Sequence, residues 1–265
     1  MRRPGSATTS PRPCRSRQVA YALALALSTA PAIAGPPFRT DDPEPVELHH
    51  AELYLAAEGV DAPDGSGGSL PLLEFNYGVL PDTQFHVVVP YGYAGLPGHH
   101  AARGLGDTEL GFKVRFLKEG RIRPQVGVFP MVELATGDSA RGLGAGHVQI
   151  YLPIWVQKSW GEWTSYGGVG WWRNPGQGRR NWTYAGWLLQ RKVSRRVAIG
   201  GEIFASTASQ EGGSGSSGYN LGAVLDVTEE HHVLVSAGRN LSGGSETHFY
   251  VGYQLTVGPR NIAQP

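Results

Sequence analysis

The stretch Gly104–Phe116, GLGDTELGFKVRF, decides the fold class of this chain. After a glycine turn it alternates, with one face made of Leu110, Phe112, Val114 and Phe116 and the other of Glu109, Gly111, Lys113 and Arg115. A strict period of two predicts a β-strand with one apolar and one polar face. A soluble sandwich would turn the charges to water, whereas a membrane barrel would turn the apolar face to lipid and the charges into its lumen. The rest of the chain has to decide between the two.

The composition favours many short strands joined by turns. The chain has 265 residues, of which 38 are glycine, 11 tyrosine and 7 tryptophan, and only 17% are charged. High glycine and aromatic content without a long apolar run is typical of all-β proteins. A formal net charge of +1 gives no basic surface of the kind that nucleic-acid binding requires. We therefore expect an all-β protein with no nucleic-acid partner.

Residues 1–34 have the pattern of a secretory signal peptide. Five arginines between Arg2 and Arg17 precede the apolar segment Val19–Ala30, and Ala32-Ile33-Ala34 is a cleavage motif that predicts a mature start near Gly35. The apolar segment is short for a spanning helix, which would be the alternative. Cys14, the one cysteine, lies within residues 1–34 and would be lost with the signal peptide. The mature chain would then have neither disulfides nor thiolate metal sites, as in many exported envelope proteins.

Twelve candidate strands follow a proline-rich, acidic stretch at 35–46, which we interpret as an extended periplasmic lead-in. The barrel-forming region is expected at 47–257, and residues 258–265 are expected to form a periplasmic tail. The predicted strands are 47–58, 69–80, 83–93, 104–116, 122–134, 147–158, 163–173, 182–192, 197–206, 219–227, 232–240 and 247–257.

The connections between these strands alternate in length. Long, polar connections follow the odd strands, at 59–68, 94–103, 135–146, 174–181, 207–218 and 241–245. Short connections follow the even strands, at 81–82, 117–121, 159–162, 193–196 and 228–231. This alternation predicts an up-and-down antiparallel β-barrel in the outer membrane, with long external loops and short periplasmic turns. A closed sheet satisfies every backbone hydrogen bond in lipid. A soluble periplasmic β-protein remains the alternative.

Tryptophans cluster near two neighbouring connections of the predicted barrel. Trp155, Trp160 and Trp163 flank one short turn, and Trp171, Trp172 and Trp182 flank the next long loop. Because aromatic side chains gather at both membrane interfaces of a barrel, this distribution predicts two aromatic girdles. A sandwich core would be the other use for so many tryptophans.

Three motifs resemble a known family. The opening stretch is similar to the Gly-x-Gly-Asp segment and alternating strand of the MetA-pathway-of-phenol-degradation proteins, a group of outer-membrane transporters. FPMVELATGDSARGLGAG at 129–146 resembles their strand-to-loop segment, and FYVGYQLTV at 249–257 resembles their closing strand. The resemblance covers about 47–257 and implies passage of small solutes, including hydrophobic or aromatic ones, without catalytic residues.

Polar side chains on the inner faces of the predicted strands form the candidate site. The lumen or gating candidates are Glu52, Glu74, Glu109, Lys113, Arg115, Glu133, Glu202, Asp226 and His248. A twelve-stranded barrel is narrow enough for side chains to fill much of it. Two lumens fit this set: a narrow water-filled channel of mixed charge, or a closed lumen braced by ion pairs that must rearrange or open sideways for transport.

Other motifs suggest chemistry that we weigh against simpler uses. Gly104-Leu-Gly106-Asp107 is followed by a strand and not by a helix, which favours a turn with an Asx-type bond over a phosphate site. The pairs His49-His50, His99-His100 and His231-His232 are expected to be solvated rim residues, because neighbours on a strand point to opposite faces. Ser236 and His248 are the least implausible hydrolase pair.

We therefore expect an exported, twelve-stranded outer-membrane barrel that passes small solutes passively. No cofactor and no metal are implied, and we expect a monomer surrounded by outer-membrane lipid. The alternatives are a lipid-hydrolase barrel and a structural envelope barrel. The chain ends in a tail and not in an aromatic residue, so recognition by the barrel-assembly machinery would rest on Phe249, Tyr250 and Tyr253.

Overall fold

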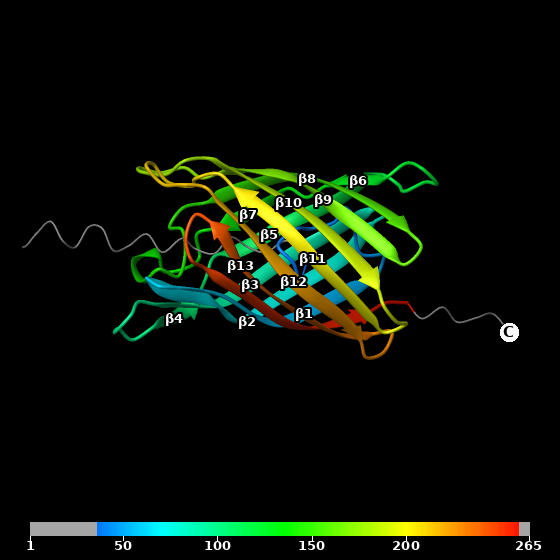
Figure 1. Cartoon of the computed structure of the whole chain (residues 1–265), viewed down its shortest axis with the longest axis horizontal. Helices are drawn as coiled ribbons and strands as arrows, with labels where there is room; N and C mark the ends of the chain where they lie inside the picture. The colour runs from blue at the N-terminus through cyan, green and yellow to red at the C-terminus, as the bar shows by residue number, and fades with distance from the viewer. Residues whose placement is uncertain (1–35, 260–265) are drawn as a thin grey trace, which may run out of the picture.

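A computed structural model describes residues 36–259 of the chain as a closed, all-β barrel (Figure 1). The predicted signal peptide with Cys14, and the tail beyond residue 259, lie outside the described residues, so they stay predictions. Among residues 36–259, no helix is both long and apolar enough to cross a membrane.

The barrel wall has twelve strand positions, and every strand pairs antiparallel with its neighbours. The strands are β1 (Ala51–Ala62), β2 (Gly65–Leu80), β3 (Thr83–Gly95), β4 (Ala102–Leu105), β5 (Thr108–Leu117), β6 (Gln125–Val128), β7 (Met131–Leu134), β8 (Gln149–Trp160), β9 (Trp163–Arg173), β10 (Trp182–Lys192), β11 (Val197–Ser206), β12 (Ser216–Asp226), β13 (His231–Ser242) and β14 (Thr247–Val257). β1 pairs with β14 and closes the cylinder. The predicted strand count and topology are confirmed.

Two of the twelve positions are each shared by two short strands. β4 and β5 both pair with β3, and they are separated by Gly106-Asp107. β6 and β7 both lie between β5 and β8, and they are separated by Phe129-Pro130. Pro130 has no N–H to donate to the ladder, which explains the second interruption. These breaks divide the predicted strands 104–116 and 122–134 without changing the count.

The outer face of the wall is apolar and the inner face is polar. Along β5, Phe116 is 61% exposed on the outside, whereas Glu109 is 2% exposed on the inside. The same parity runs around the ring, so the exposed aliphatic and aromatic side chains form a continuous lipid-facing belt. This inside-out arrangement excludes the soluble alternative and is that of a membrane-spanning barrel.

The connection between β1 and β2 differs from the predicted long loop at 59–68. Both strands extend past the expected ends and leave only Pro63-Asp64 as a turn. Gly65, Ser66, Gly67 and Gly68 pair with the last residues of β1, so the ladder continues past the predicted ends of both strands. The loops after β7, β9 and β11 are long as predicted, and those after β2 and β8 are two-residue turns.

The segment 36–46 lies inside the barrel. Phe38, Thr40 and Asp41 are at most 1% exposed, although no strand contains them. The segment enters at the end with the short turns, where Leu48 bridges to Gly78. The segment was expected to be an extended periplasmic lead-in, but in the structure it lies in the lumen of the barrel and fills part of it.

Tryptophans divide between the two faces of the wall. Trp160, Trp163 and Trp171 are exposed on the outside, as expected of a girdle. Trp155, Trp172 and Trp182 point inward, and Trp155 has no exposed surface at all. The prediction that all six of these tryptophans form two girdles is thus wrong for Trp155, Trp172 and Trp182. The inward aromatic cluster contains Phe129, Met131, Tyr151, Trp155, Trp172, Trp182, Tyr184 and Phe204.

Candidate functional site: the barrel lumen

Glycines on the inner face make room for the N-terminal segment 36–46. A Cβ at Gly186 would lie 2.2 Å from Oγ1 of Thr40, and one at Gly222 would lie 2.9 Å from the ring of Phe38. A Cβ at Gly127 would approach Pro43 to 3.1 Å. Real Cβ atoms do not approach other atoms below about 3 Å, so close approach of the segment requires glycine at the first two positions. The wall is shaped to the segment.

Glu202 on β11 holds the upper part of the segment. Its two carboxylate oxygens accept hydrogen bonds from the backbone N–H groups of Arg39 at 2.8 Å and Thr40 at 2.7 Å. The amide of Asn220 on β12 donates to the same carboxylate at 2.6 Å. The Thr40 hydroxyl lies 3.2 Å from the Tyr184 hydroxyl. Charge-assisted bonds of this kind are about twice as strong as neutral ones, so Glu202 is the main clamp.

Lys113 on β5 holds the lower part of the segment. Its Nζ donates to Asp41 at 2.9 Å and lies 3.7 Å from Asp42. Both Lys113 and Asp41 are almost fully buried, so each charge depends on the other for its solvation. Below this pair, the Glu44 carboxylate accepts from the amides of Gln125 and Gln157, both at 3.2 Å.

A network of buried polar side chains lies on β2, β3 and β5. The amide of Asn76 donates to Glu74 at 2.7 Å, and Asn76 Oδ1 lies 2.6 Å from Nδ1 of His86. Nε2 of His86 lies 2.9 Å from the Glu109 carboxylate. Each ring nitrogen of His86 therefore lies within hydrogen-bond distance of an oxygen atom, which fixes the ring from two sides. With Glu58 on β1 and Glu133 on β7, this side is called the acidic wall below, defined by Glu58, Glu74, Glu109 and Glu133.

The opposite side of the lumen is aromatic. Trp172 on β9 stacks on Tyr151 at 4.5 Å between ring centroids and on Trp182 at 5.3 Å. Tyr184 stacks with Phe204 at 6.4 Å, and the guanidinium of Arg39 lies 4.5 Å from the centroid of Phe204. The aromatic wall below means Tyr151, Trp155, Trp172, Trp182, Tyr184 and Phe204.

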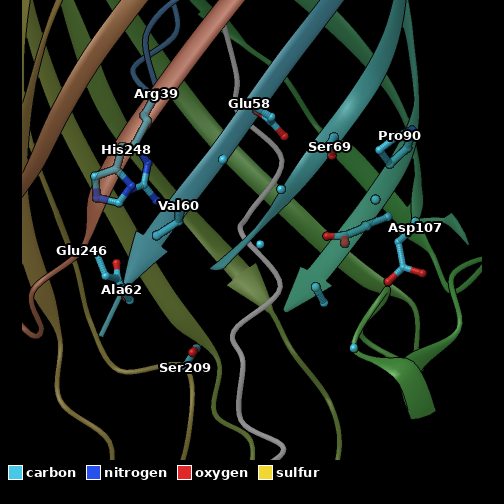
Figure 2. Close-up of a pocket in the computed structure, with 18 of the residues that line it drawn as sticks. Arg39, Glu58, Val60, Ala62, Ser69, Pro90, Asp107, Ser209, Glu246 and His248 are labelled. Atoms are coloured by element: carbon cyan, nitrogen blue, oxygen red, sulfur yellow. The ribbon is translucent and has the colours of Figure 1, made fainter. Parts of the chain in front are cut away.

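A cavity of about 490 Å³ opens above the segment, on the side of the long loops. It is lined by both walls, and Pro36, Pro37 and Arg39 contribute to its floor. Figure 2 shows Arg39 beside His248, with Glu58 across the cavity and Asp107 near its mouth. Seven carboxylate residues and two arginines line this external vestibule: Glu58, Asp64, Glu74, Asp107, Glu109, Glu133, Glu246, Arg39 and Arg179.

Asp107 fixes the loop between β7 and β8 at the mouth. Its carboxylate accepts from the N–H of Gly137 at 2.8 Å and from that of Ala145 at 2.5 Å. The predicted Asx-type bond within the glycine turn is therefore replaced by bonds to a distant loop. Leu143 and Ala145 of this loop are buried as a result.

At the opposite, short-turn end, Asp82 gathers two basic side chains. Its carboxylate lies 2.8 Å from Lys118 and 2.7 Å from Arg115. The hydrogen bond from Lys118, followed by that from Arg115, lowers the pKa of Asp82. Asp226 lies at this same end, 2.8 Å from Nδ1 of His232, with its side chain 41% exposed.

The nine predicted lumen residues are therefore not one group. Glu74 and Glu109 share the polar network; Glu133 pairs with Glu109 across β5 and β7. Lys113, Arg115 and Glu202 contact the N-terminal segment, and Glu52 accepts from the Tyr54 hydroxyl at 2.7 Å. His248 lines the vestibule, whereas Asp226 lies at the short-turn end. Sequence reasoning missed Asp41, Glu58 and Tyr184; the last two follow from the period of their strands, but Asp41 had no such signal.

The residues weighed for other chemistry have separate partners. The hydroxyl of Ser236 donates to the Pro37 carbonyl, and Nε2 of His248 lies 2.9 Å from Asn240 Oδ1. They do not pair with each other through these bonds. Within the part of the chain that the structure describes, no group of three or more His, Cys, Asp or Glu is placed to hold a metal ion. His99 and His100 are exposed in the loop after β3.

Comparison with solved structures finds the same barrel in outer-membrane channels. The chain is similar to the COG4313 outer membrane channel from Pseudomonas putida F1, with a TM-score of 0.65 and 14% identity over 82% of this chain and 98% of that one. It is also similar to the KdgM porin in complex with disordered oligogalacturonate (TM-score 0.55, 9% identity, 77% and 98% covered). The NanC porin is similar as well, with a TM-score of 0.54 and 6% identity over 77% of this chain and 98% of that one.

No protein-family model and no curated protein matches the chain. At these identities the solved structures show the fold alone. The chain therefore has the twelve-stranded barrel fold of outer-membrane channels and porins, with an apolar belt for the membrane around a lumen that its own N-terminal segment occupies.

Proposed function

We propose that this chain is a monomeric outer-membrane channel for the passive passage of small solutes, closed at rest by its segment 36–46. The observation that carries the proposal is the fit of this segment to the lumen. The segment is buried against inner-face glycines and is fastened by Glu202 and Lys113. On the external side it leaves a vestibule that is large enough for a small organic molecule.

The nature of the solute is a finer part of this proposal. The resemblance to the MetA-pathway family implies small solutes that include hydrophobic or aromatic ones. Trp172 and Trp182 line the vestibule and offer flat apolar surfaces to such solutes. The Lys113–Asp41 ion pair and the bonds from Glu202 to the backbone of the segment must open for a solute to pass through the lumen, so closure and passage are coupled.

A conductance measurement tests this proposal. Mature protein lacking residues 36–46 is placed in a planar bilayer and compared with the intact chain. We expect a conductance several-fold higher in the shortened chain, and an intermediate rise for Glu202→Ala, which removes two charge-assisted bonds to the segment. Glu229→Ala, an exposed carboxylate in the turn after β12, is the matched control and is expected to leave conductance unchanged.

Heat-modifiable gel mobility confirms that each variant forms a barrel. Equal conductance of the intact and shortened chains, together with no solute uptake into liposomes by either one, would contradict the proposal. The hydrolase alternative finds no support in the contacts of Ser236 and His248, whose hydrogen bonds go to Pro37 and Asn240.

A further inference from the structure

Four buried polar atoms of residues that line the external vestibule have no hydrogen-bond partner within residues 36–259. They are Oε2 of Glu58, Oε2 of Glu109, Oδ1 of Asn220 and the hydroxyl of Tyr250. An ionised carboxylate oxygen and an amide oxygen accept hydrogen bonds and cannot donate them. The Tyr250 hydroxyl can accept a hydrogen bond as well as donate one. Each of these four residues is more than nine-tenths buried. The vestibule is therefore complementary to a ligand that donates hydrogen bonds.

The charge of the vestibule indicates that this donor is a cation. Seven carboxylate residues line it against two arginines. One of these, Arg179, donates to the carbonyl of Ala145 in the mouth loop at 3.0 Å. Glu109 and Glu133 lie directly opposite each other on β5 and β7. Two like charges in such a pair repel, and a cation between or beside them removes the repulsion.

Three other carboxylates of the vestibule accept hydrogen bonds from the protein. Asp107 binds two backbone N–H groups, and the Glu246 carboxylate accepts from the amide of Asn240 at 2.8 Å. Glu74 accepts from Asn76. Among the fully buried carboxylate oxygens of the vestibule, those without a hydrogen-bond partner in the described residues belong to Glu58 and Glu109, and Figure 2 shows Glu58 on β1 at the edge of the cavity.

The side facing these carboxylates is flat and apolar. Trp172 and Trp182 line the same cavity, with parallel rings 5.3 Å apart. Aromatic surfaces bind apolar groups and also attract cations through the electrons of the ring face. A ligand that bridges the cavity would then have a donor head and an apolar body.

We infer that the external vestibule is a binding site for small organic ammonium ions, whose head donates to Glu58 and Glu109 while the apolar body lies against Trp172 and Trp182. A cavity of about 490 Å³ is within the size range of small-molecule sites. The role of this site in passage rests on the proposed channel function, but binding itself does not require passage.

Binding of phenethylammonium to the folded full-length mature barrel in detergent tests this inference. Titration calorimetry and quenching of tryptophan fluorescence give the dissociation constant. The uncharged 2-phenylethanol and the anion phenylacetate have nearly the same body. We expect saturable binding of phenethylammonium that is at least about tenfold tighter than that of the alcohol, because a hydrogen bond to a charged group is worth about that factor.

Isosteric variants locate the site. Glu58→Gln and Glu109→Gln should each weaken phenethylammonium binding about tenfold or more, since each replaces a free anionic acceptor with a neutral amide. Glu246→Gln makes the same charge change in the same cavity, at a carboxylate that already has a donor, and should cost at most about threefold. Gln at position 109 can still form a hydrogen bond with Nε2 of His86, as acceptor or as donor, so the network remains bonded.

Three outcomes would overturn the inference: equal losses in all three variants, equal binding of amine and alcohol, or no saturable binding of the amine at millimolar concentration. If Glu109→Gln fails to form a barrel, the comparison of amine binding by Glu58→Gln and by Glu246→Gln tests the inference by itself. Conductance is measured separately. Amine binding without any conductance in the shortened chain would refute the proposed channel function but not the binding site. Conductance without amine binding would refute the binding site but not the channel function.

Discussion

The acidic wall and the aromatic wall face each other across one lumen, yet they are filled in different ways. Tyr151, Trp155 and Trp172 belong to one buried cluster that is formed by side chains of the wall itself. Next to the acidic wall, Lys113 depends on Asp41 of the N-terminal segment, and the carboxylates of Glu58 and Glu109 keep free oxygens. Packing therefore makes one side rigid by itself, whereas buried charge makes the other side dependent on what occupies the lumen.

The largest effect on stability is expected on the aromatic wall. Trp155→Ala removes a side chain with no exposed surface and should lower the free energy of unfolding by about 3–5 kcal/mol, because it leaves a cavity. Urea unfolding of the barrel in detergent, followed by circular dichroism, measures this. Trp187→Ala, on the lipid side and half exposed, is the control and should cost clearly less. Equal costs would show that the aromatic wall is not a packed core.

A smaller effect on stability, but a larger one on conductance, is expected beside the acidic wall. Lys113→Met leaves Asp41 without its cation. Breaking a buried pair in a rigid site costs about 3–5 kcal/mol. Here the segment can leave the lumen instead, which exposes Asp41 to water. We therefore expect a smaller loss in the free energy of unfolding than in a rigid site, together with a higher conductance. Adding Asp41→Leu should restore closure, since an apolar pair needs no solvation. An unchanged conductance in Lys113→Met would count against this contrast.

A single methyl group should test the fit of the segment. Gly186→Ala places a Cβ 2.2 Å from Thr40 Oγ1 and should cost about 1–3 kcal/mol through overpacking, with a rise in conductance. Gly120→Ala, whose nearest contact would be 3.6 Å away, is the control. In a chain without residues 36–46, the part of the cost that Thr40 causes should disappear, whereas the part caused by the Tyr184 hydroxyl, 2.7 Å from the added Cβ, should remain. The same cost in both backgrounds would mean that the segment does not press on this glycine.

The smallest effect is expected at Asp82, outside both walls. Its pKa is lowered by Lys118 and Arg115, so its ion pairs stabilise the barrel above the ordinary pKa of an aspartate, and this contribution is lost as pH falls through the lowered value. Asp82→Asn should cost less than about 1 kcal/mol at pH 7 and nothing at strongly acid pH. Asn tolerates the positive φ of 59° at this position. Urea midpoints across pH measure the difference, with Asp64→Asn as control; a pH-independent cost would exclude the ion pairs as its source.

Alternation was enough to predict the wall. The inward parity of Glu109 and Lys113 and the twelve positions follow from a period of two, because a side chain on a strand has only two directions. The same rule places Trp155 inside, between Gln149 and Gln157 on one face of β8. The girdle interpretation went wrong by taking tryptophans as a class instead of following each strand's parity.

The contents of the lumen could not be predicted in this way. Residues 36–46 have no period, and their prolines suit an extended lead-in as well as they suit a segment inside a barrel. The partners of Lys113 and Glu202 lie 72 and 162–163 positions away in sequence and are set by closure of the ring. Asp226 has the inward parity of its strand, but its position near the strand end puts it outside the lumen.

The covalent link between segment 36–46 and β1 makes the segment a tethered ligand of its own barrel. Its docking is unimolecular, and a short tether gives an effective concentration on the order of millimolar, whatever the amount of protein in the membrane. The fraction of empty lumens then depends only on the docking free energy, and each loss of about 1.4 kcal/mol raises it about tenfold while docking dominates. Any molecule that enters from outside competes with this fixed internal concentration and not with other copies of the protein.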